Sequence, residues 1–452
     1  MKITFLGAVE TVTGSKYLLE SSSKKILVDC GLFQGHKELR SKNWSKLPFE
    51  PSNIDAVILT HAHIDHTGYI PLLVKNGFKG KIYCSDGTFA LCKILLPDSG
   101  FLQEEEAQFA NKYGYSKHTP AMPLYTAEDA KISLEQFQPC DFEKINTFFD
   151  KNITFQFRAA GHILGASTVY IKMNDISVTF SGDVGRMQDP IMRPPKPIPY
   201  TDYLVLESTY GNRLHHKMDP QSQLKAIINR TVKRGGTIVI PAFAVGRAQS
   251  ILYYIHELKT NKQIPDIPVF LDSPMAISVT DLFCQFMQEH RLTKNKCEYL
   301  NSVAIYTNSV AESKKIDTIQ GSKIIISASG MATGGRVLHH INVFGPDEKS
   351  TIIFTGFQAA GTRGERMLKG EKEIRLLGET VKINAEVTEL HNTSAHADYE
   401  ELLEWLKRVP KAPKKVFLTH GEPDAALALK KYIEEKLHWT CVIPKYLQEE
   451  VL

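Results

Sequence analysis

The sequence has few cysteines, and they follow no recognisable pattern. Seven cysteines are scattered over 452 residues, and no two of them form a C-x-x-C pair. An odd and scattered set argues against a disulfide framework and against a zinc site built from thiolates. The chain also lacks an uninterrupted run of 18 apolar residues, so no membrane partner is expected. These absences exclude small disulfide-stapled proteins and membrane-spanning proteins.

The first residues give no sign of a targeting segment. Residues 1–10 end on an acidic residue, and their composition is that of a strand rather than of a signal peptide. The overall composition, 42% hydrophobic and 23% charged residues, is that of a folded globular protein with sizeable cores. We therefore expect a cytoplasmic protein of two or three domains.

Positive charge is in small excess, and it is unevenly distributed along the chain. The net charge is +4, and residues 207–386 alone carry 23 Lys and Arg against 17 Asp and Glu. The rest of the chain is slightly acidic. A moderately basic central segment favours an anionic polymer as a partner.

Two patterns of secondary structure divide the chain. Up to about residue 205, β-branched runs are punctuated by Gly, Asn and Asp, as in strands. Residues 98–147 differ, and we expect a helical excursion with a loop inside it. From about residue 205, short apolar runs alternate with helical stretches such as 219–234, where Asp219 is a suitable N-cap. This alternation predicts a doubly wound parallel sheet.

The strongest chemical signal is the segment His61-Ala-His63-Ile-Asp65-His66, which directly follows an apolar strand. His61 and His63 are two residues apart, so an extended strand end directs both side chains to the same side. The turn that follows can bring Asp65 and His66 close to them. Imidazole and carboxylate groups suit Zn²⁺ or Mn²⁺, so the segment predicts a metal site.

Three further residues lie at the ends of other predicted strands. His162 stands between two glycines, and Asp183 follows the apolar run 176–181. A carboxylate has two oxygens and can bridge two metal ions. Asp29 ends another strand, and there we expect it to orient a ligand histidine.

The later motifs narrow the interpretation to one family. The segment Leu206-Glu-Ser-Thr-Tyr-Gly211 resembles motif A of the β-CASP family, Ser394-Ala-His-Ala-Asp398 resembles motif B, and Leu418-Thr-His-Gly-Glu422 resembles motif C. Together with the histidine segment, they resemble the metallo-β-lactamase fold, an α/β protein with an αββα sandwich and an inserted β-CASP domain. The family includes the mRNA 3′-end cleavage endonuclease and ribonuclease J, and the chain resembles its short prokaryotic members.

The resemblance implies a division of the chain and a class of substrate. It implies a metallo-β-lactamase domain in two parts, 1–205 and 387–452, around an inserted β-CASP domain at 206–386. RNA-acting members have a histidine in motif C, where DNA-repair members typically have valine. His420 therefore favours RNA over DNA.

The resemblance also implies a set of roles. One metal ion would be held by His61, His63 and His162, the other by Asp65, His66 and His420, and Asp183 would bridge them. Two Zn²⁺ ions are expected, with Mn²⁺ as the alternative. Asp65 is also expected to accept the proton of the attacking water, and His396, held by Glu207, to protonate the leaving oxygen.

Substrate contacts are expected in the inserted domain. The loop 327–336 is rich in small residues and precedes a predicted helix, so its backbone N–H groups can cradle a phosphate. We assign substrate binding to Ser329, Gly330 and Arg336 of this loop and to Arg363 on a second glycine-flanked loop. Phosphate contacts carry no sequence information, which favours single-stranded RNA with weak sequence preference.

Several alternatives stay open at this stage. An endonuclease is the first expectation, and a 5′-exoribonuclease with the same residues is the alternative. Less weight falls on a small-molecule thioester or lactam hydrolase, a DNA nuclease and an inactive RNA-binding scaffold. The sequence also leaves a homodimer open.

Overall fold

The computed structural model describes residues 1–21, 24–114, 116, 118–148, 152–356, 358 and 361–452. The chain forms two compact units. The first unit comprises Met1–Leu214 and His396–Leu452, and the second comprises His215–Ala395. The domain boundaries expected from the sequence, after residues 205 and 386, stay a prediction. Each unit is described by itself below.

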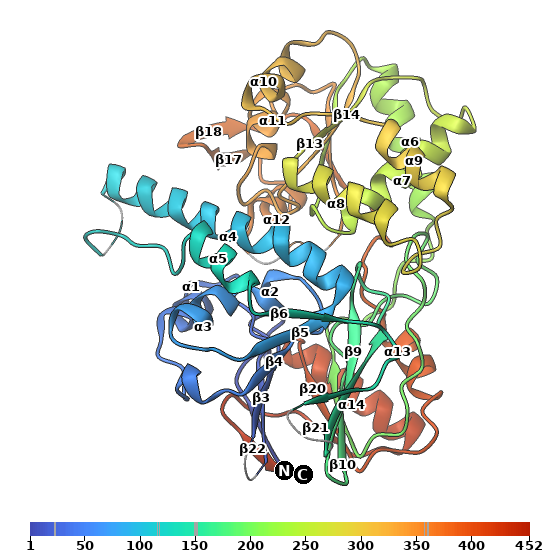
Figure 1. Ribbon diagram of the computed structural model, residues 1–452. Coiled ribbons are helices and arrows are strands. Elements are labelled where there is room, and N and C mark those ends of the chain that lie inside the picture. Colours follow the sequence, from blue (N-terminus) through green and yellow to red (C-terminus); the bar gives the residue numbers. More distant parts are fainter. Residues whose placement is uncertain (22–23, 115, 117, 149–151, 357, 359–360) are drawn as a thin grey trace. The chain divides into compact units, whose positions relative to one another are not determined.

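Two sheets form the centre of the first unit (Figure 1). Within the described residues, one sheet has the strand order β22 (Glu449–Val451), β1 (Lys2–Phe5), β2 (Tyr17–Glu20), β3 (Lys25–Val28), β4 (Ala56–Ile58), β5 (Lys81–Ser85) and β6 (Phe137–Cys140). The other has the order β21 (Cys441–Val442), β20 (Lys415–Thr419), β11 (Tyr203–Glu207), β10 (Ile176–Phe180), β9 (Ser167–Met173), β8 (Ile153–Ala159) and β7 (Asn146–Phe148).

The core between these sheets follows from the alternation of side chains along each strand. Ile26 and Val28 of β3 pack in one buried cluster with Phe155 and Phe157 of β8. Residues two apart on a strand point to the same face, so each strand gives one row of apolar side chains to this layer. The two sheets therefore bury a common apolar core.

Helices cover the outer faces of the two sheets. Leu204 and Leu206 of β11 point away from the sheet–sheet core and pack in another buried cluster with Trp405 of α13 (Tyr399–Leu406) and Leu429 of α14 (Pro423–Leu437). The first unit is thus an αββα sandwich, as expected. Its helices are α1 (Lys37–Ser41), α2 (Ile64–Thr67), α3 (Ile70–Lys75), α4 (Asp86–Tyr113), α5 (Ala127–Leu134), α13 (Tyr399–Leu406) and α14 (Pro423–Leu437), with 3₁₀ turns at Lys42–Trp44 and Pro51–Asn53.

The helical excursion expected over 98–147 is only partly correct. Helices α4 and α5 occupy most of it, and the long α4 is conspicuous in Figure 1. Its end, however, contains β6 and part of β7, which add one strand to each sheet. Pairing with β5 forms β6 although its sequence, Phe-Gln-Pro-Cys, has little strand character.

The second unit contains a parallel six-stranded sheet among its described residues. The strand order is β14 (Ile305–Tyr306), β13 (Val269–Asp272), β15 (Ile324–Ser327), β12 (Ile238–Pro241), β16 (Thr351–Phe354) and β19 (Glu386–Glu389), and a separate hairpin is formed by β17 (Glu373–Leu376) and β18 (Glu379–Lys382). The helices are α6 (Pro220–Lys233), α7 (Arg247–Thr260), α8 (Pro274–Gln285), α9 (Lys294–Ser302), α10 (Val310–Thr318), α11 (Val337–Phe344) and α12 (Arg363–Leu368).

Two predictions for this unit are confirmed. The strands pair in parallel, as the alternation of strands and helices indicated. Helix α6 begins where expected, because the Asp219 carboxylate accepts hydrogen bonds from the backbone N–H groups of Gln221 and Ser222.

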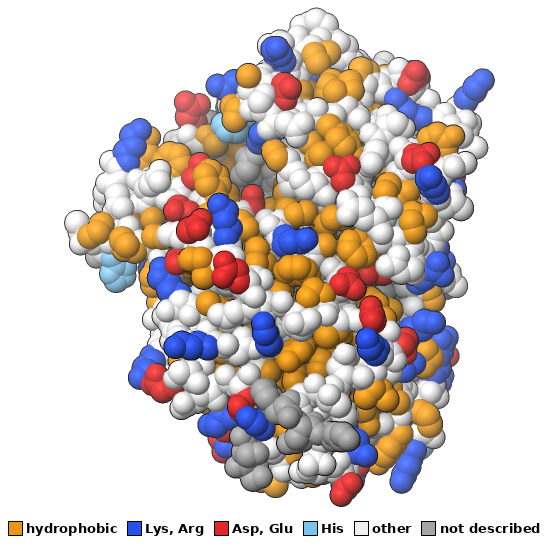
Figure 2. Space-filling view, viewed as in Figure 1, with side chains coloured by type: hydrophobic (Ala, Val, Ile, Leu, Met, Phe, Trp, Pro, Cys, Tyr) orange, Lys and Arg blue, Asp and Glu red, His pale blue; other side chains and the backbone are white. Residues whose placement is uncertain are grey.

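Two surface properties bear on the expected partners. In the described part of the chain, every helix falls short of the length or the apolar character needed to cross a bilayer. On the face shown in Figure 2, Lys and Arg side chains of the described residues lie among Asp and Glu side chains. The positively charged side chains visible on this face are therefore dispersed rather than gathered in one stripe.

Candidate metal centre

The histidine segment spans the end of the loop after β4 and the beginning of α2, which contains Asp65 and His66. His61 Nε2 lies 3.1 Å from His63 Nδ1, and His162 Nε2 lies 3.3 Å from the same His63 nitrogen. With Asp183, these histidines form a group whose donor atoms all lie within 4.8 Å of one another. Residues 61, 63 and 162 thus converge although β5 to β8 separate them in the sequence.

A second group of donors lies beside the first. It consists of Asp65, His66 and His420, again with donor atoms within 4.8 Å of one another. The Nε2 atoms of His66 and His420 are 3.0 Å apart, and His420 Nε2 is 3.4 Å from Asp65 Oδ2. The first group, which includes Asp183, and the second group together contain all seven residues assigned as metal ligands by resemblance.

Asp183 lies between the two groups. Its Oδ2 is 3.4 Å from His61 Nε2 and 3.6 Å from His162 Nε2. Its Oδ1 is 3.4 Å from His66 Nε2 and 3.5 Å from His420 Nδ1. Each carboxylate oxygen therefore faces one donor group, which is the placement that a bridging ligand needs.

The chemistry of this donor set fits metal ions. Asp183 Oδ1 is buried and has no hydrogen-bond partner among the described residues, and a buried carboxylate oxygen without a hydrogen bond is costly unless cationic groups offset its charge. Burial, reinforced by the neighbouring His61, lowers the pKa of His63 to about 3. Burial likewise lowers the pKa of His162. Neutral imidazole is the form that binds a metal.

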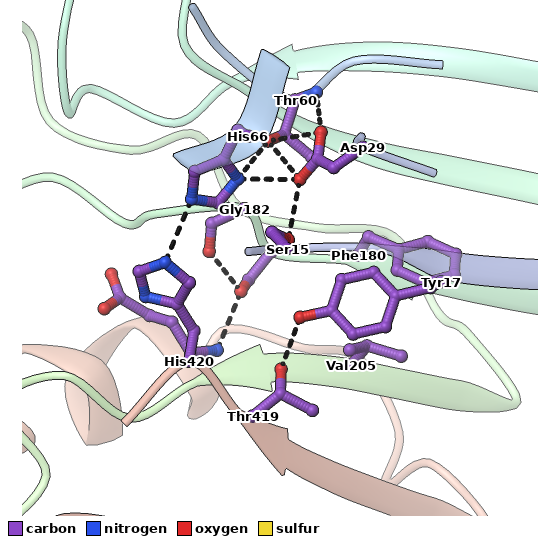
Figure 3. Close-up of a pocket in the computed structure, with 12 residues that line it drawn as sticks. Ser15, Tyr17, Asp29, Thr60, His66, Phe180, Gly182, Val205, Thr419 and His420 are labelled. Atoms are coloured by element: carbon purple, nitrogen blue, oxygen red, sulfur yellow. Dashed lines mark hydrogen bonds and ion pairs between the residues drawn. The ribbon is translucent and has the colours of Figure 1, made fainter. Parts of the chain in front are cut away.

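Asp29 lies behind the centre and contacts a histidine there. Its Oδ2 is 2.7 Å from His66 Nδ1, and its Oδ1 accepts a hydrogen bond of 2.8 Å from the Thr60 backbone N–H (Figure 3). The hydroxyls of Thr60 and Ser15 donate to the same carboxylate. These contacts fix the imidazole so that its Nε2 points toward His420, away from Asp29.

His396 and Glu207 form a pair at the edge of the centre. His396 Nδ1 is 3.1 Å from Glu207 Oε2, and His396 Nε2 is 4.0 Å from Asp183 Oδ2. Glu207 is fixed in turn by the backbone N–H of Val184. Although burial opposes charging, the carboxylates of Glu207 and Asp183 raise the pKa of His396 to about 9. The imidazole is thus poised to carry a proton.

The sequence analysis missed several residues that position this centre. The Thr60 hydroxyl lies 3.1 Å from His61 Nδ1, and the Thr209 hydroxyl lies 3.2 Å from His420 Nδ1. Tyr17 donates a hydrogen bond to the Thr419 hydroxyl, one residue before His420 (Figure 3). Thr60 directly precedes the histidine segment and Thr209 lies within motif A, and these positions in the sequence were the signal available. Tyr17 gave no such signal.

The predicted substrate-binding residues lie in the second unit. The Ser329 hydroxyl accepts hydrogen bonds from the backbone N–H groups of Thr333 and Gly334, within its own loop. Arg336 bonds to Asp272 and to the carbonyls of Thr307 and Asn308.

Gly330 belongs to this loop, and Arg363 contacts the loop from outside. Gly330 lies against the Phe243 ring, which a Cβ atom at this position would approach to 2.8 Å. Arg363 donates to the carbonyls of Ala332, Thr333 and Arg375. These contacts give both arginines a part in holding the loop, and their role in binding substrate stays a prediction.

Comparisons with protein families cover most of the chain. Residues 11–227 match the metallo-beta-lactamase superfamily, residues 248–367 match the Beta-Casp domain, and residues 380–444 match the Zn-dependent metallo-hydrolase RNA specificity domain. Together with the paired donor groups, these matches define a metal-dependent hydrolase of the nuclease class.

Individual relatives match over nearly the whole of this chain. "Ribonuclease TTHA0252" of Thermus thermophilus is 32% identical, with 96% of each chain covered. The "RNase J-like protein" of Methanocaldococcus jannaschii is 30% identical, with 98% of this chain and 97% of the relative covered. "Transcription termination factor FttA" of Methanosarcina mazei is 32% identical over 97% of this chain and 69% of its own length. The chain therefore belongs to the β-CASP family of the metallo-β-lactamase superfamily.

A solved structure shares the fold. A protein of unknown function from Enterococcus faecalis V583 superposes with a TM-score of 0.56 at 14% identity, with 100% of this chain and 99% of that chain covered. At this identity the likeness concerns the fold alone.

Proposed function

We propose that the protein is a ribonuclease that hydrolyses internal phosphodiester bonds of single-stranded RNA. The observation that carries the proposal is the buried pair of donor groups with the His396–Glu207 pair at its edge. Two relatives that match over nearly their whole length carry the words ribonuclease and RNase in their names, which supports RNA as the substrate. The matched RNA specificity domain supports it as well.

The donor groups would hold two Zn²⁺ ions. His61, His63 and His162 would bind one ion, Asp65, His66 and His420 the other, and Asp183 would bridge them. Five imidazoles among seven ligands favour Zn²⁺, and Mn²⁺ is the alternative. When bound, the metals supply Lewis-acid activation of water and neutralise charge on the phosphate oxygens.

The chain's own residues supply the proton transfers. Asp65 lies at the edge of the second donor group, where its carboxylate accepts the proton of the attacking water. His396 Nε2 faces the centre and donates a proton to the leaving oxygen, while Glu207 holds the Nδ1–H and so fixes the tautomer. Glu207 also stabilises the charged imidazole before transfer, in agreement with the raised pKa of His396.

Digestion of a circular single-stranded RNA tests this proposal. A circle has no 5′ end, so only an endonuclease can open it, and we expect linear products in the presence of Zn²⁺ or Mn²⁺. Cleavage of a linear 5′-labelled RNA to mononucleotides, with the circle intact, would indicate a 5′-exoribonuclease instead.

Matched controls make the result specific to the centre. The Asp65→Ala variant should lose cleavage, whereas Asp175→Ala, which removes an exposed carboxylate of the β9–β10 turn, should retain it. A single-stranded DNA of the same sequence should be cut poorly. If neither RNA is cut while metal is bound, the proposal is wrong.

A further inference from the structure

Tyr210, another residue of motif A, lies beside His396 and has no part in the proposed mechanism. The Tyr210 ring is nearly parallel to the His396 imidazole, with ring centres 6.1 Å apart and an interplanar angle of 21°. The Arg213 guanidinium carbon lies 5.2 Å from the centre of the same Tyr210 ring. The exposed Arg213 thus contacts Tyr210, which in turn lies beside His396, the proposed proton donor.

The turn that carries Arg213 is held firmly to the first unit. Gly211 packs so closely on α14 that a Cβ atom there would lie 2.4 Å from the Ala425 carbonyl oxygen. Asn212 donates a 2.7 Å hydrogen bond to Asp424, and its side-chain oxygen accepts one from Arg213 Nε. The guanidinium is therefore positioned by packing and by hydrogen bonds, unlike a solvated surface arginine.

The distances place this cation close to the reacting centre. The two ring distances put the guanidinium carbon no more than 11.3 Å from the His396 ring centre. One strand of a stacked duplex advances about 3.4 Å per nucleotide, so the gap corresponds to about three nucleotides, or fewer in an extended strand. Arginine is well suited to phosphate because it offers several N–H donors in one plane.

We propose that Arg213 binds an RNA backbone phosphate within about three nucleotides of the scissile bond, on the side of the leaving oxygen. The side follows from its connection to His396, which protonates that oxygen. This inference rests on the proposed ribonuclease function and adds a substrate-binding residue in the first unit. Tyr210 acts as the positioning residue that holds the guanidinium beside the centre.

Steady-state cleavage of an oligouridylate of about a dozen nucleotides tests the proposal. We expect Arg213→Ala to raise KM about tenfold, the effect of one charge-assisted contact, with a much smaller change in kcat. The slope of log KM against log salt concentration should fall by about 0.7, the value for one phosphate contact on a single strand. Arg213→Lys should retain the slope and recover part of the KM.

A small substrate separates a binding role from a structural one. Bis(4-nitrophenyl) phosphate contains only the phosphate that reacts. In Arg213→Ala, the ratio of kcat/KM on the oligonucleotide to kcat/KM on this diester should therefore fall at least fivefold. The exposed Arg40 of α1 provides the control, because Arg40→Ala should leave both the slope and the ratio as in the wild type.

The outcomes separate the two proposals. An unchanged salt slope in Arg213→Ala, or a loss confined to kcat on both substrates, would overturn the assignment of Arg213 while the ribonuclease function stands. A wild-type protein with metal bound that cleaves the diester but not RNA would overturn both.

Discussion

Replacing Asp29 by asparagine should weaken one of the two metal sites without disturbing the fold. The substitution keeps the size of the side chain but changes what it can donate and accept. Thr60 donates its backbone N–H to Asp29 Oδ1, so the amide oxygen of the introduced asparagine must occupy that position. The amide NH₂ then faces His66 Nδ1, where Oδ2 lay at 2.7 Å.

This exchange forces the wrong tautomer on His66. Facing an NH₂ donor, Nδ1 must accept a hydrogen bond, and the imidazole proton moves to Nε2. Nε2 is the atom of His66 that faces the second donor group, 3.0 Å from His420 Nε2. Once protonated, it has no lone pair with which to bind a metal. Loss of such an orienting contact typically costs 10- to 100-fold in metal affinity, or about 1.4–2.7 kcal/mol.

Competition with a chelator of known zinc affinity measures the effect. We expect the wild type to bind two Zn²⁺ ions, and Asp29→Asn to bind one as tightly and the other 10- to 100-fold more weakly. Asp175→Asn, on an exposed turn, serves as the matched control. Two ions bound by Asp29→Asn with wild-type affinities would refute the reasoning about the tautomer.

Three further predictions concern the centre and the two cores. His396→Ala should lower the single-turnover rate on RNA by 10²- to 10⁴-fold with its metal content intact, and a wild-type rate would remove His396 from proton transfer. Buried His340 is paired with Asp272 and Asp317; although burial opposes charging, these carboxylates raise its pKa. Its contribution to stability is therefore complete below about pH 6.5 and is lost as pH rises through the raised pKa. The urea midpoint of the second unit should therefore fall as the pH is raised, and His340→Leu should remove this pH dependence. Trp405→Ala, in the fully buried core against β11 and β20, should lower the free energy of unfolding by about 3–5 kcal/mol in urea titration, and a loss under about 1 kcal/mol would contradict this packing.

The local parts of the candidate centre could be predicted from the sequence. His61, His63, Asp65 and His66 lie within six residues, so the end of one strand and one turn bring them together. The approach of His162, Asp183 and His420 depends on the order of strands in two sheets. Strands β20, β11 and β10 are neighbours, which brings their carboxyl ends to one edge of the sheet. Only the family resemblance supplied that order beforehand.

Other features depend on contacts that no local pattern contains. Strand β6 forms because β5 offers a free edge, not because of its own residues. The hydrogen bond below His420 joins Tyr17 to Thr419, which are 402 positions apart in the sequence and lie in different sheets. Arg336 and Arg363 were expected to face a ligand, and their bonds to Asp272 and to loop carbonyls could not be inferred from composition.

Zinc titration of the metal-free protein, with RNA cleavage followed at each step, tests the central claim most directly. If the paired donor groups form one catalytic centre, activity should rise with added zinc and saturate at about two ions per chain. Asp183→Ala, which removes the carboxylate between the two groups, should not recover activity at any zinc concentration. Full cleavage by the metal-free protein, or by Asp183→Ala, would contradict the account.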